Sequence, residues 1–216
     1  WLSFAEPHNP YQVPEPYFDM FPPDSLPPVR TTRDEWKNRG FKYEFTRWMG
    51  LTGFPDYDEQ YDRARSNYLG MLRLIDDQVE RLIDHLRDAG QLDNTIVVFV
   101  SDHGDFVGEY GLMRKGPEMP DCLMRIPFVW HGPGIVRDPS PHSAHVSLLD
   151  VFPTICEAIG AKIPIGVQGR SLWPLLTGAP YPEAEFESVY AEQGMGGLHY
   201  TDGDEIIAPT DDGLFP

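Results

Sequence analysis

The clearest pattern of hydrophobic and polar positions lies between residues 58 and 89. Apolar side chains recur there every three or four residues, which is the spacing of a single buried stripe along a helix. The stripe consists of Tyr61, Ala64, Tyr68, Met71, Leu72, Ile75, Val79, Leu82, Ile83 and Leu86. The opposite face is charged, and we expect it to be solvated. Gly90 ends the predicted helix.

A short apolar run follows this helix after a turn at Asp93 and Asn94. Residues 95–100 are β-branched or aromatic and polar sequence follows at once, so the run predicts a buried strand. In an open α/β sheet such a strand delivers its last side chains to the crevice where ligands bind. Weaker patterns predict strands over residues 1–5, 126–130 and 187–191, a helix over 32–48 interrupted near Gly40, and a helix over 148–159.

Asp102 and His103 stand at the carboxyl end of the predicted strand. A carboxylate is a hard oxygen donor and a neutral imidazole a borderline nitrogen donor, so the pair can share a divalent cation. Neighbours on a regular strand face opposite ways, so both reach one ion only where the backbone bends, and Gly104 permits a bend. The alternative is that Asp102 caps the next turn and His103 is an ordinary loop histidine. These three residues alone leave both interpretations open.

The composition narrows the range of partners. The 216 residues are 41% hydrophobic and 12% aromatic, which suffices for one sizeable core. The net charge is −17, and such a surface repels nucleic acid and anionic membranes, so we expect neither as a partner. No apolar run approaches the roughly 18 residues of a membrane span. Two cysteines, Cys122 and Cys156, are too few to indicate a compartment, so periplasmic, secreted and cytoplasmic locations all stay open.

Several motifs resemble the C-terminal half of the sulfatase catalytic domain, in the order that the family has them. Residues 101–112 read S-D-H-G-D-x-x-G-E-x-G-L, and Lys115-Gly116 follows at short range. The other matching segments are Trp1-Leu2-Ser3-Phe4, Pro7-His8-Asn9-Pro10-Tyr11, Arg125-Ile126-Pro127-Phe128, Gly132-Pro133-Gly134, Asp150 with Pro153-Thr154, and Gly169-Arg170-Ser171-Leu172. That family belongs to the alkaline phosphatase-like superfamily of metal-dependent hydrolases, and the resemblance covers most of the chain.

The resemblance implies an α/β fold, namely an alkaline phosphatase-like three-layer sandwich with a mixed central sheet between helices, present here as a fragment. Residues 1–182 would form the C-terminal half of the catalytic domain. Residues 183–216 would hold its last strand and the lead-in to a small C-terminal subdomain. The missing N-terminal half of the same domain would then be a partner of this chain.

The resemblance also implies metal-dependent hydrolysis of a sulfate ester. Asp102 and His103 would be two ligands of a divalent ion, expected to be Ca²⁺, with Mn²⁺ as the alternative that a histidine ligand favours. His8 would contact the sulfate ester and protonate the leaving oxygen, and Lys115 would bind a sulfate oxygen. Without the family, a histidine in a proline-rich loop and a lone lysine are more often solvated surface residues.

The nucleophile that the resemblance implies is a formylglycine made from Cys or Ser in the pattern Cys/Ser-x-Pro-x-Arg. Neither cysteine starts this pattern, and the segment from Ser25 has Val29 where arginine is required. We therefore expect the nucleophile to lie upstream of this chain, which alone would be inactive. Tyr110 also departs from the family, in which a histidine is commoner after the glutamate.

Three functions are consistent with these residues. The first is a sulfatase, a sulfuric ester hydrolase acting on a sulfated small molecule or carbohydrate. The second is a phosphonate monoester or phosphodiester hydrolase of the same superfamily, because the Asp-His-Gly pair and the lysine would serve a phosphoryl centre equally well. The third is a non-catalytic metal- or carbohydrate-binding protein on a decayed sulfatase scaffold.

Overall fold

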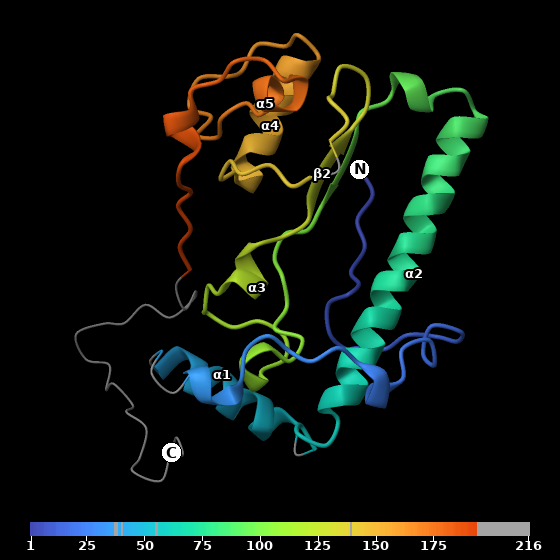
Figure 1. Ribbon diagram of the computed structural model, residues 1–216, viewed down its shortest axis with the longest axis vertical. Coiled ribbons are helices and arrows are strands. Elements are labelled where there is room, and N and C mark those ends of the chain that lie inside the picture. Colours follow the sequence, from blue (N-terminus) through green and yellow to red (C-terminus); the bar gives the residue numbers. More distant parts are fainter. Residues whose placement is uncertain (37–38, 40, 55, 139, 194–216) are drawn as a thin grey trace. The chain divides into compact units, whose positions relative to one another are not determined.

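The computed structural model describes residues 1–36, 39, 41–54, 56–138 and 140–193 (Figure 1). The chain divides into two compact units. Among the described residues, unit 1 comprises Trp1–Glu80 and His103–Arg125 together with Gln193, and unit 2 comprises Arg81–Asp102 and Ile126–Glu192. One boundary falls within the long helix, and another separates Asp102 from His103. The predicted division at residues 182 and 183 stays a prediction, and residues 194–216 lie outside the described part.

The long helix in Figure 1 is α2 (Tyr61–Asp88), which confirms the helix that the apolar stripe predicts. Within unit 1 its stripe residues Met71 and Ile75 are buried. Polar side chains of α2 also bind the proline-rich segment that precedes α1. The hydroxyl of Ser66 donates to the carbonyl of Phe21 at 2.5 Å, and the amide of Asn67 donates to the carbonyl of Tyr11 at 2.9 Å. These bonds hold that segment on the helix surface.

The core of unit 1 is an aromatic cluster. Tyr43 of α1 (Phe41–Gly53) contacts Phe106 and Tyr110 edge-on, with ring centroids 6.3 and 5.5 Å apart. Leu112 and Leu123 complete the cluster, and Phe106 and Leu112 are fully buried. The remaining short helices of unit 1 are η1 (Pro23–Ser25), η2 (Arg33–Trp36), η4 (Glu109–Gly111) and α3 (Asp121–Met124).

The single helix predicted over residues 32–48 is wrong in its boundaries. The structure has a separate 3₁₀ turn, η2, followed by α1, which continues to Gly53. The carboxylate of Glu35 accepts the backbone N–H of Thr32 at 2.8 Å, so the predicted capping pair is present. This pair caps the short turn η2 and does not start α1.

Unit 2 contains one antiparallel pair of strands, β1 (Val97–Val100) and β2 (Phe128–His131), with Val97 opposite His131 and Val100 opposite Phe128. This pair confirms two of the predicted strands, and it is the sheet found within the described residues. The predicted burial of the first strand is wrong, because Phe99 is exposed and Val97, Val98 and Val100 are only half-buried. The predicted strands over residues 1–5 and 187–191 are wrong, because neither segment is assigned to a strand. A strand needs a neighbour to accept its backbone hydrogen bonds, and among described residues neither segment pairs in a sheet.

The helical part of unit 2 is organised by a buried carboxylate, that of Asp150. It accepts the backbone N–H of Ser147 at 2.8 Å, which caps the turn η5 (Leu148–Asp150) before α4 (Val151–Ala158), and the N–H of Arg170 at 2.7 Å. Thr154 accepts the N–H of Leu172 at 2.8 Å. Asp150 of η5 and Thr154 of α4 therefore hold the 169–172 turn. The remaining helices of unit 2 are η3 (Leu92–Asn94), α5 (Trp173–Thr177) and η6 (Glu183–Phe186).

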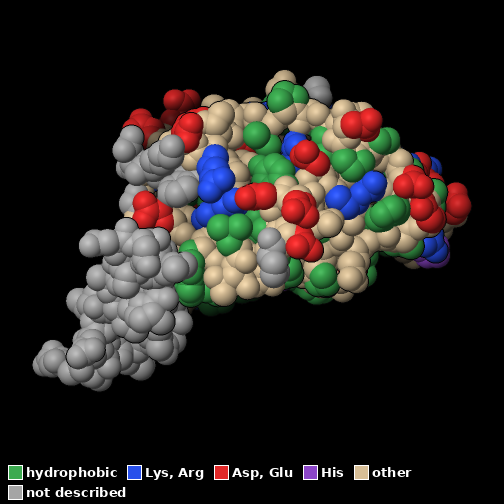
Figure 2. Space-filling model, turned by 90° about the horizontal axis from the view of Figure 1, so that it is seen from below, with side chains coloured by type: hydrophobic (Ala, Val, Ile, Leu, Met, Phe, Trp, Pro, Cys, Tyr) green, Lys and Arg blue, Asp and Glu red, His purple; other side chains and the backbone are tan. Residues whose placement is uncertain are grey.

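Charged side chains of both signs are interspersed on the face drawn in Figure 2. The least exposed of the paired cations is Arg47 of α1, which donates to Asp58 at 2.5 Å and to the carbonyl of Gly111 at 3.2 Å. The guanidinium bond is the main cause that lowers the pKa of Asp58. Arg47 thereby ties α1 to the 109–111 turn. In the described part of the chain, no helix combines the length and apolar character needed to cross a membrane.

Glu118 is a carboxylate buried in unit 1, with 3% of its surface exposed. The hydroxyl of Thr46 donates to one carboxylate oxygen at 2.6 Å, and the other oxygen has no hydrogen-bond partner within the described residues. Burial raises the pKa of Glu118 above its ordinary value of 4.5, against the hydrogen bond from Thr46. A buried carboxyl without full hydrogen bonding favours its neutral form.

The raised pKa makes the stability of the protein depend on pH. Between about 4.5 and the higher folded-state pKa, the folded carboxyl keeps a proton that the unfolded one loses. The free energy of unfolding therefore falls as the pH rises through this interval. We expect Glu118→Gln, which is neutral at every pH, to flatten this fall in urea unfolding series. The exposed Glu44→Gln serves as the control, and an unchanged pH slope in Glu118→Gln would contradict the expectation.

Candidate functional site

The segment from His103 to Lys115 folds back on itself within unit 1. The N–H of Phe106 donates to the carbonyl of Arg114, and the N–H of Gly108 donates to the carbonyl of Leu112, both at 2.8 Å. The two ends of the segment consequently lie side by side. The ammonium of Lys115 contacts Nε2 of His103.

Gly104 fixes the backbone next to His103. Its N–H donates to the carbonyl of Leu123 at 2.8 Å, and a side chain at this position would collide with the carbonyl of Cys122. Glycine is thus needed here because of a close backbone approach, whereas the sequence suggested a bend. Burial raises the pKa of the Cys122 thiol to about 12. A thiol with so high a pKa is not a nucleophile near neutral pH.

The contacts of His103 define its tautomer. Nδ1 lies 2.7 Å from the carbonyl oxygen of Gly104, which can only accept, and Nε2 faces an ammonium, which can only donate. The hydrogen-bond pattern therefore assigns the proton to Nδ1 and the lone pair to Nε2. Histidines that ligate metals also have one ring nitrogen fixed by a carbonyl or a carboxylate.

His8 approaches the same place from the N-terminal loop. Its ring lies edge-on to His103, with centroids 6.4 Å apart at 70°. Its Nδ1 lies 2.7 Å from the carbonyl of Asn9, so Nε2 is the nitrogen left for other partners. Three of the four site residues proposed from the sequence, His8, His103 and Lys115, thus come together in unit 1.

The fourth residue, Asp102, belongs to unit 2, so its predicted partnership with His103 in holding a metal stays a prediction. Within the residues that the structure describes, no group of three or more His, Cys, Asp or Glu side chains could hold a metal ion. In unit 1, Nδ1 of His103 is fixed by the carbonyl of Gly104 and Nε2 contacts the ammonium of Lys115, so its role as a metal ligand also stays a prediction.

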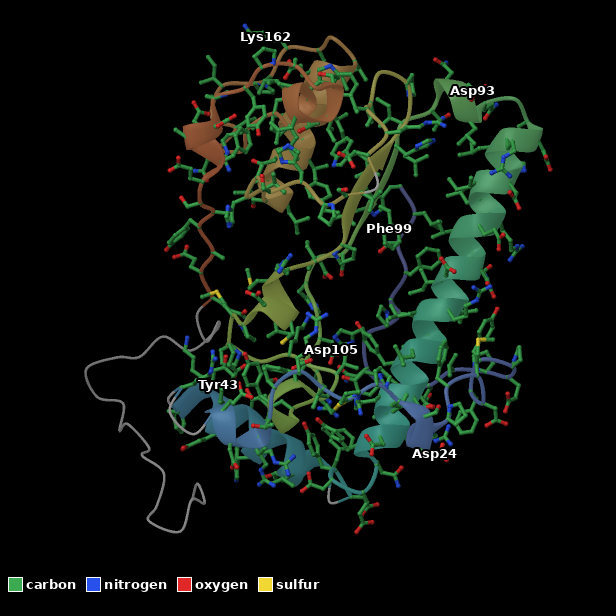
Figure 3. The ribbon with its side chains drawn as sticks, viewed as in Figure 1. Asp24, Tyr43, Asp93, Phe99, Asp105 and Lys162 are labelled. Carbon is green, nitrogen blue, oxygen red and sulfur yellow. The ribbon has the colours of Figure 1, made fainter. Side chains whose placement is uncertain are left out.

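Sequence reasoning missed the residues that hold this site together. Tyr11, three positions after His8, donates its hydroxyl to Asp105 at 2.8 Å. Asp105, which is labelled in Figure 3, also accepts the N–H groups of Val107 at 3.0 Å and Arg114 at 2.9 Å. Burial raises the pKa of Asp105, although these hydrogen bonds oppose the rise. Both residues are part of the motifs quoted above. The sequence did not indicate that Tyr11 contacts Asp105, and only the structure shows this contact.

Glu109 and Tyr110, where the chain departs from the family pattern, have structural contacts. The carboxylate of Glu109 accepts the backbone N–H groups of Arg30 at 3.1 Å and Thr31 at 2.9 Å. Tyr110 lies in the aromatic core. Ser25, the near-match to the nucleophile pattern, lies in η1 with its hydroxyl donating to the carbonyl of Pro22 at 2.9 Å, as expected of a proline-rich turn.

A hollow of about 220 Å³ adjoins Lys115 in unit 1. Its lining is mainly apolar and comes from α1, from Tyr57 and from the segment after Leu112. The lining residues are Phe45, Thr46, Met49, Gly50, Tyr57, Met113, Arg114, Lys115, Gly116 and Pro117. The arrangement places an apolar surface beside a cation.

Comparison with known proteins identifies the class. A family model described as Sulfatase matches residues 1–161, well over half of the chain. The chain therefore belongs to the sulfatase family. This finding confirms the resemblance carried by the motifs.

Individual relatives agree with this class. An arylsulfatase from Clostridium perfringens is 31% identical over 178 residues, which cover 81% of this chain and 36% of that protein. An N-acetylglucosamine-6-O-sulfatase from Bacteroides thetaiotaomicron is 34% identical over 117 residues, which cover 54% of this chain and 21% of that protein. This chain thus spans well under half the length of either relative.

Solved structures confirm the alkaline phosphatase-like α/β fold class. The phosphonate monoester hydrolase from Silicibacter pomeroyi matches with a TM-score of 0.69 at 32% identity. The match covers 81% of this chain and 36% of that protein. The fold is thus shared with sulfatases and with phosphonate hydrolases alike.

Proposed function

We propose that the protein containing this chain hydrolyses a sulfate ester, with a divalent metal ion and a formylglycine nucleophile supplied from outside these residues. The observation that carries the proposal is the convergence of His8, His103 and Lys115 in unit 1. Family membership and the arylsulfatase relative support the reaction class. Cys122 is a poor nucleophile for the reason given by its pKa, which agrees with a nucleophile elsewhere.

In this proposal each residue of the site has a defined task. Lys115 neutralises charge on a nonbridging oxygen, and an ammonium placed there stabilises the charge that persists in the transition state. His8 gives its Nε2 proton to the leaving alcohol oxygen as an imidazolium, because Nδ1 keeps the proton that faces the carbonyl of Asn9. His103 offers the lone pair of Nε2 as a ligand, and Asp102 a carboxylate. A bound divalent ion, with Ca²⁺ or Mn²⁺ as candidates, supplies Lewis acidity and orients the ester.

The contact between Lys115 and His103 has a consequence within the proposal. A ligand bond to a metal would use the same lone pair that now faces the ammonium. For His103 to act as a ligand, Lys115 would have to leave Nε2 of His103. The freed ammonium is then available to the ester.

The substrate is proposed to be a sulfated small molecule or sugar. The relative from Bacteroides thetaiotaomicron is named for a sulfated sugar, which supports the second choice. The net charge of −17 argues against a long polyanionic glycan, because like charges repel.

A second function is favoured by a specific observation. The phosphonate monoester hydrolase structure matches most of this chain at 32% identity, so the same site is a candidate for phosphonate monoesters or phosphodiesters. Rates on sulfate, phosphonate and phosphodiester substrates that share one leaving group distinguish the two functions. We expect kcat/KM to be highest for the sulfate ester, and a higher value for the phosphonate would reverse the assignment.

Lys115 tests whether the site is catalytic at all. We expect Lys115→Ala in the full-length protein to lower kcat/KM for the preferred ester by about 10²- to 10³-fold, because one charge-stabilising donor is lost. Lys162→Ala, at an exposed lysine of unit 2, is the matched control. Equal activities of both variants would remove Lys115 from the active site, and an inactive full-length parent protein would favour the non-catalytic alternative.

His103 tests the metal site separately from turnover. We expect His103→Ala to weaken binding of Ca²⁺ or Mn²⁺ by at least about 10- to 100-fold, since loss of even an indirect partner of a ligand has that effect. Titration calorimetry on the full-length protein measures it. His85→Ala, at an exposed histidine of α2, should bind as the parent does. Unchanged affinity in His103→Ala would remove this residue from the ligand set.

A further inference from the structure

The three functional side chains of unit 1 come from two separate segments, the loop around His8 and the return from His103 to Lys115. One hydrogen-bonded cluster joins them. It consists of the Tyr11 hydroxyl, the Asp105 carboxylate and the backbone N–H of Arg114. We propose that Tyr11 and Asp105 are positioning residues, which set where the ammonium of Lys115 lies relative to His8 and His103. The inference rests on the proposed function.

Three hydrogen-bond contacts join the three groups of the cluster. The Tyr11 hydroxyl donates to Asp105 at 2.8 Å and accepts the N–H of Arg114 at 2.8 Å. The same N–H reaches the second carboxylate oxygen of Asp105 at 2.9 Å. Each partner thus contacts the other two. The hydroxyl of Tyr11 is used both as donor and as acceptor, which a phenylalanine cannot reproduce.

Arg114 is the residue through which the cluster acts on Lys115. Its N–H is held by Tyr11 and Asp105, and its carbonyl accepts the N–H of Phe106 at 2.8 Å. Its guanidinium stacks on the ring of Phe54, 3.9 Å from the ring centroid. Both ends of this residue and its side chain are therefore held, and the Cα of Lys115 follows directly.

The backbone around the cluster is strained. Val107 and Arg114 have φ angles of 43° and 69°, in the left-handed region that residues with a side chain rarely adopt. Such conformations persist where the surroundings over-determine them, and they gather at functional sites. The N–H groups of both strained residues bind Asp105. Asp105 stabilises both of these strained positions, and it thereby helps to set the backbone conformation between His103 and Lys115.

The test is Tyr11→Phe in the full-length protein, which removes one hydroxyl and no carbon. The matched control is Tyr17→Phe, because Tyr17 also donates its hydroxyl to an aspartate, Asp77, at 2.7 Å. Both variants lose one tyrosine–aspartate hydrogen bond in unit 1. We expect Tyr11→Phe to lower kcat by about 10- to 100-fold with KM within about twofold of the parent, and Tyr17→Phe to leave both values near those of the parent.

A second readout does not need turnover. Acetylation of the Lys115 amine, followed by peptide mass spectrometry, reports how firmly the ammonium is held, with the other lysines of the chain as internal references. Loss of a fixed contact worth one hydrogen bond should raise the rate at Lys115 by about 2- to 10-fold in Tyr11→Phe. Asp105→Asn should raise it as well, because Nδ2 of asparagine cannot accept the Tyr11 hydroxyl.

The outcomes separate the two proposals. If the full-length parent does not hydrolyse the ester, the proposed function fails, whatever Tyr11→Phe does. If the parent is active and Lys115→Ala is equally active, Lys115 lies outside the active site and the positioning role is overturned with it. If Lys115→Ala is impaired but Tyr11→Phe matches Tyr17→Phe in kcat and in Lys115 acetylation, the positioning role is overturned. A Tyr11→Phe protein that unfolds at much lower urea than Tyr17→Phe would also overturn it, because the cluster would then be structural. Lower kcat with faster acetylation and parent-like stability supports it.

Discussion

The site depends on the hydrogen-bonded return of the chain between Phe106 and Arg114. Lys115 is twelve residues from His103, and an extended segment of that length would carry it roughly 40 Å away. Two backbone hydrogen bonds within this segment bring the side chains of His103 and Lys115 into contact instead. Phe106 and Leu112 of the same segment are fully buried. The arrangement of His103 and Lys115 is therefore a property of loop packing against the core of unit 1.

Burial of Phe106 and Leu112 stabilises the segment between Phe106 and Arg114 but does not determine its backbone conformation. Apolar contacts are non-directional, whereas the left-handed angles at Val107 and Arg114 require specific partners. Asp105 supplies them from inside the loop and Tyr11 from the N-terminal loop. Glu109 adds a second tie, to the backbone at Arg30 and Thr31. Hydrogen bonds thus determine the backbone conformation of this segment, and burial in the aromatic cluster stabilises it.

The elements that the sequence predicts well are those with a local cause. The stripe of α2 and the β-branched run of β1 need only periodicity and residue type. Residues 1–5 look as apolar as β1, yet they are not a strand, because pairing depends on a distant neighbour. The boundary of α1 also escaped prediction, since the Thr32–Glu35 bond closes a separate turn.

The same distinction applies to the site. His8, His103 and Lys115 could be proposed from motifs, and the structure brings them together. Tyr11 and Asp105 stand in the same motifs, but their importance follows from a bond between residues 94 positions apart. Asp150 and Thr154 illustrate the converse, because these motif residues hold the 169–172 turn through backbone N–H groups. The presence of a residue in a motif therefore does not tell whether its role is functional or structural.

Charge explains why the proposed site is a candidate for two ester classes. A sulfate monoester, a phosphonate monoester and a phosphodiester each carry a single negative charge shared by nonbridging oxygens at neutral pH. An ammonium such as Lys115 stabilises that charge without distinguishing sulfur from phosphorus, because its attraction depends on charge and distance. Selectivity has to come from groups that contact the rest of the ester. In unit 1 the hollow beside Lys115, with Phe45, Met49 and Tyr57 in its lining, offers such contacts, so the apolar surface next to the cation is where the two functions would diverge.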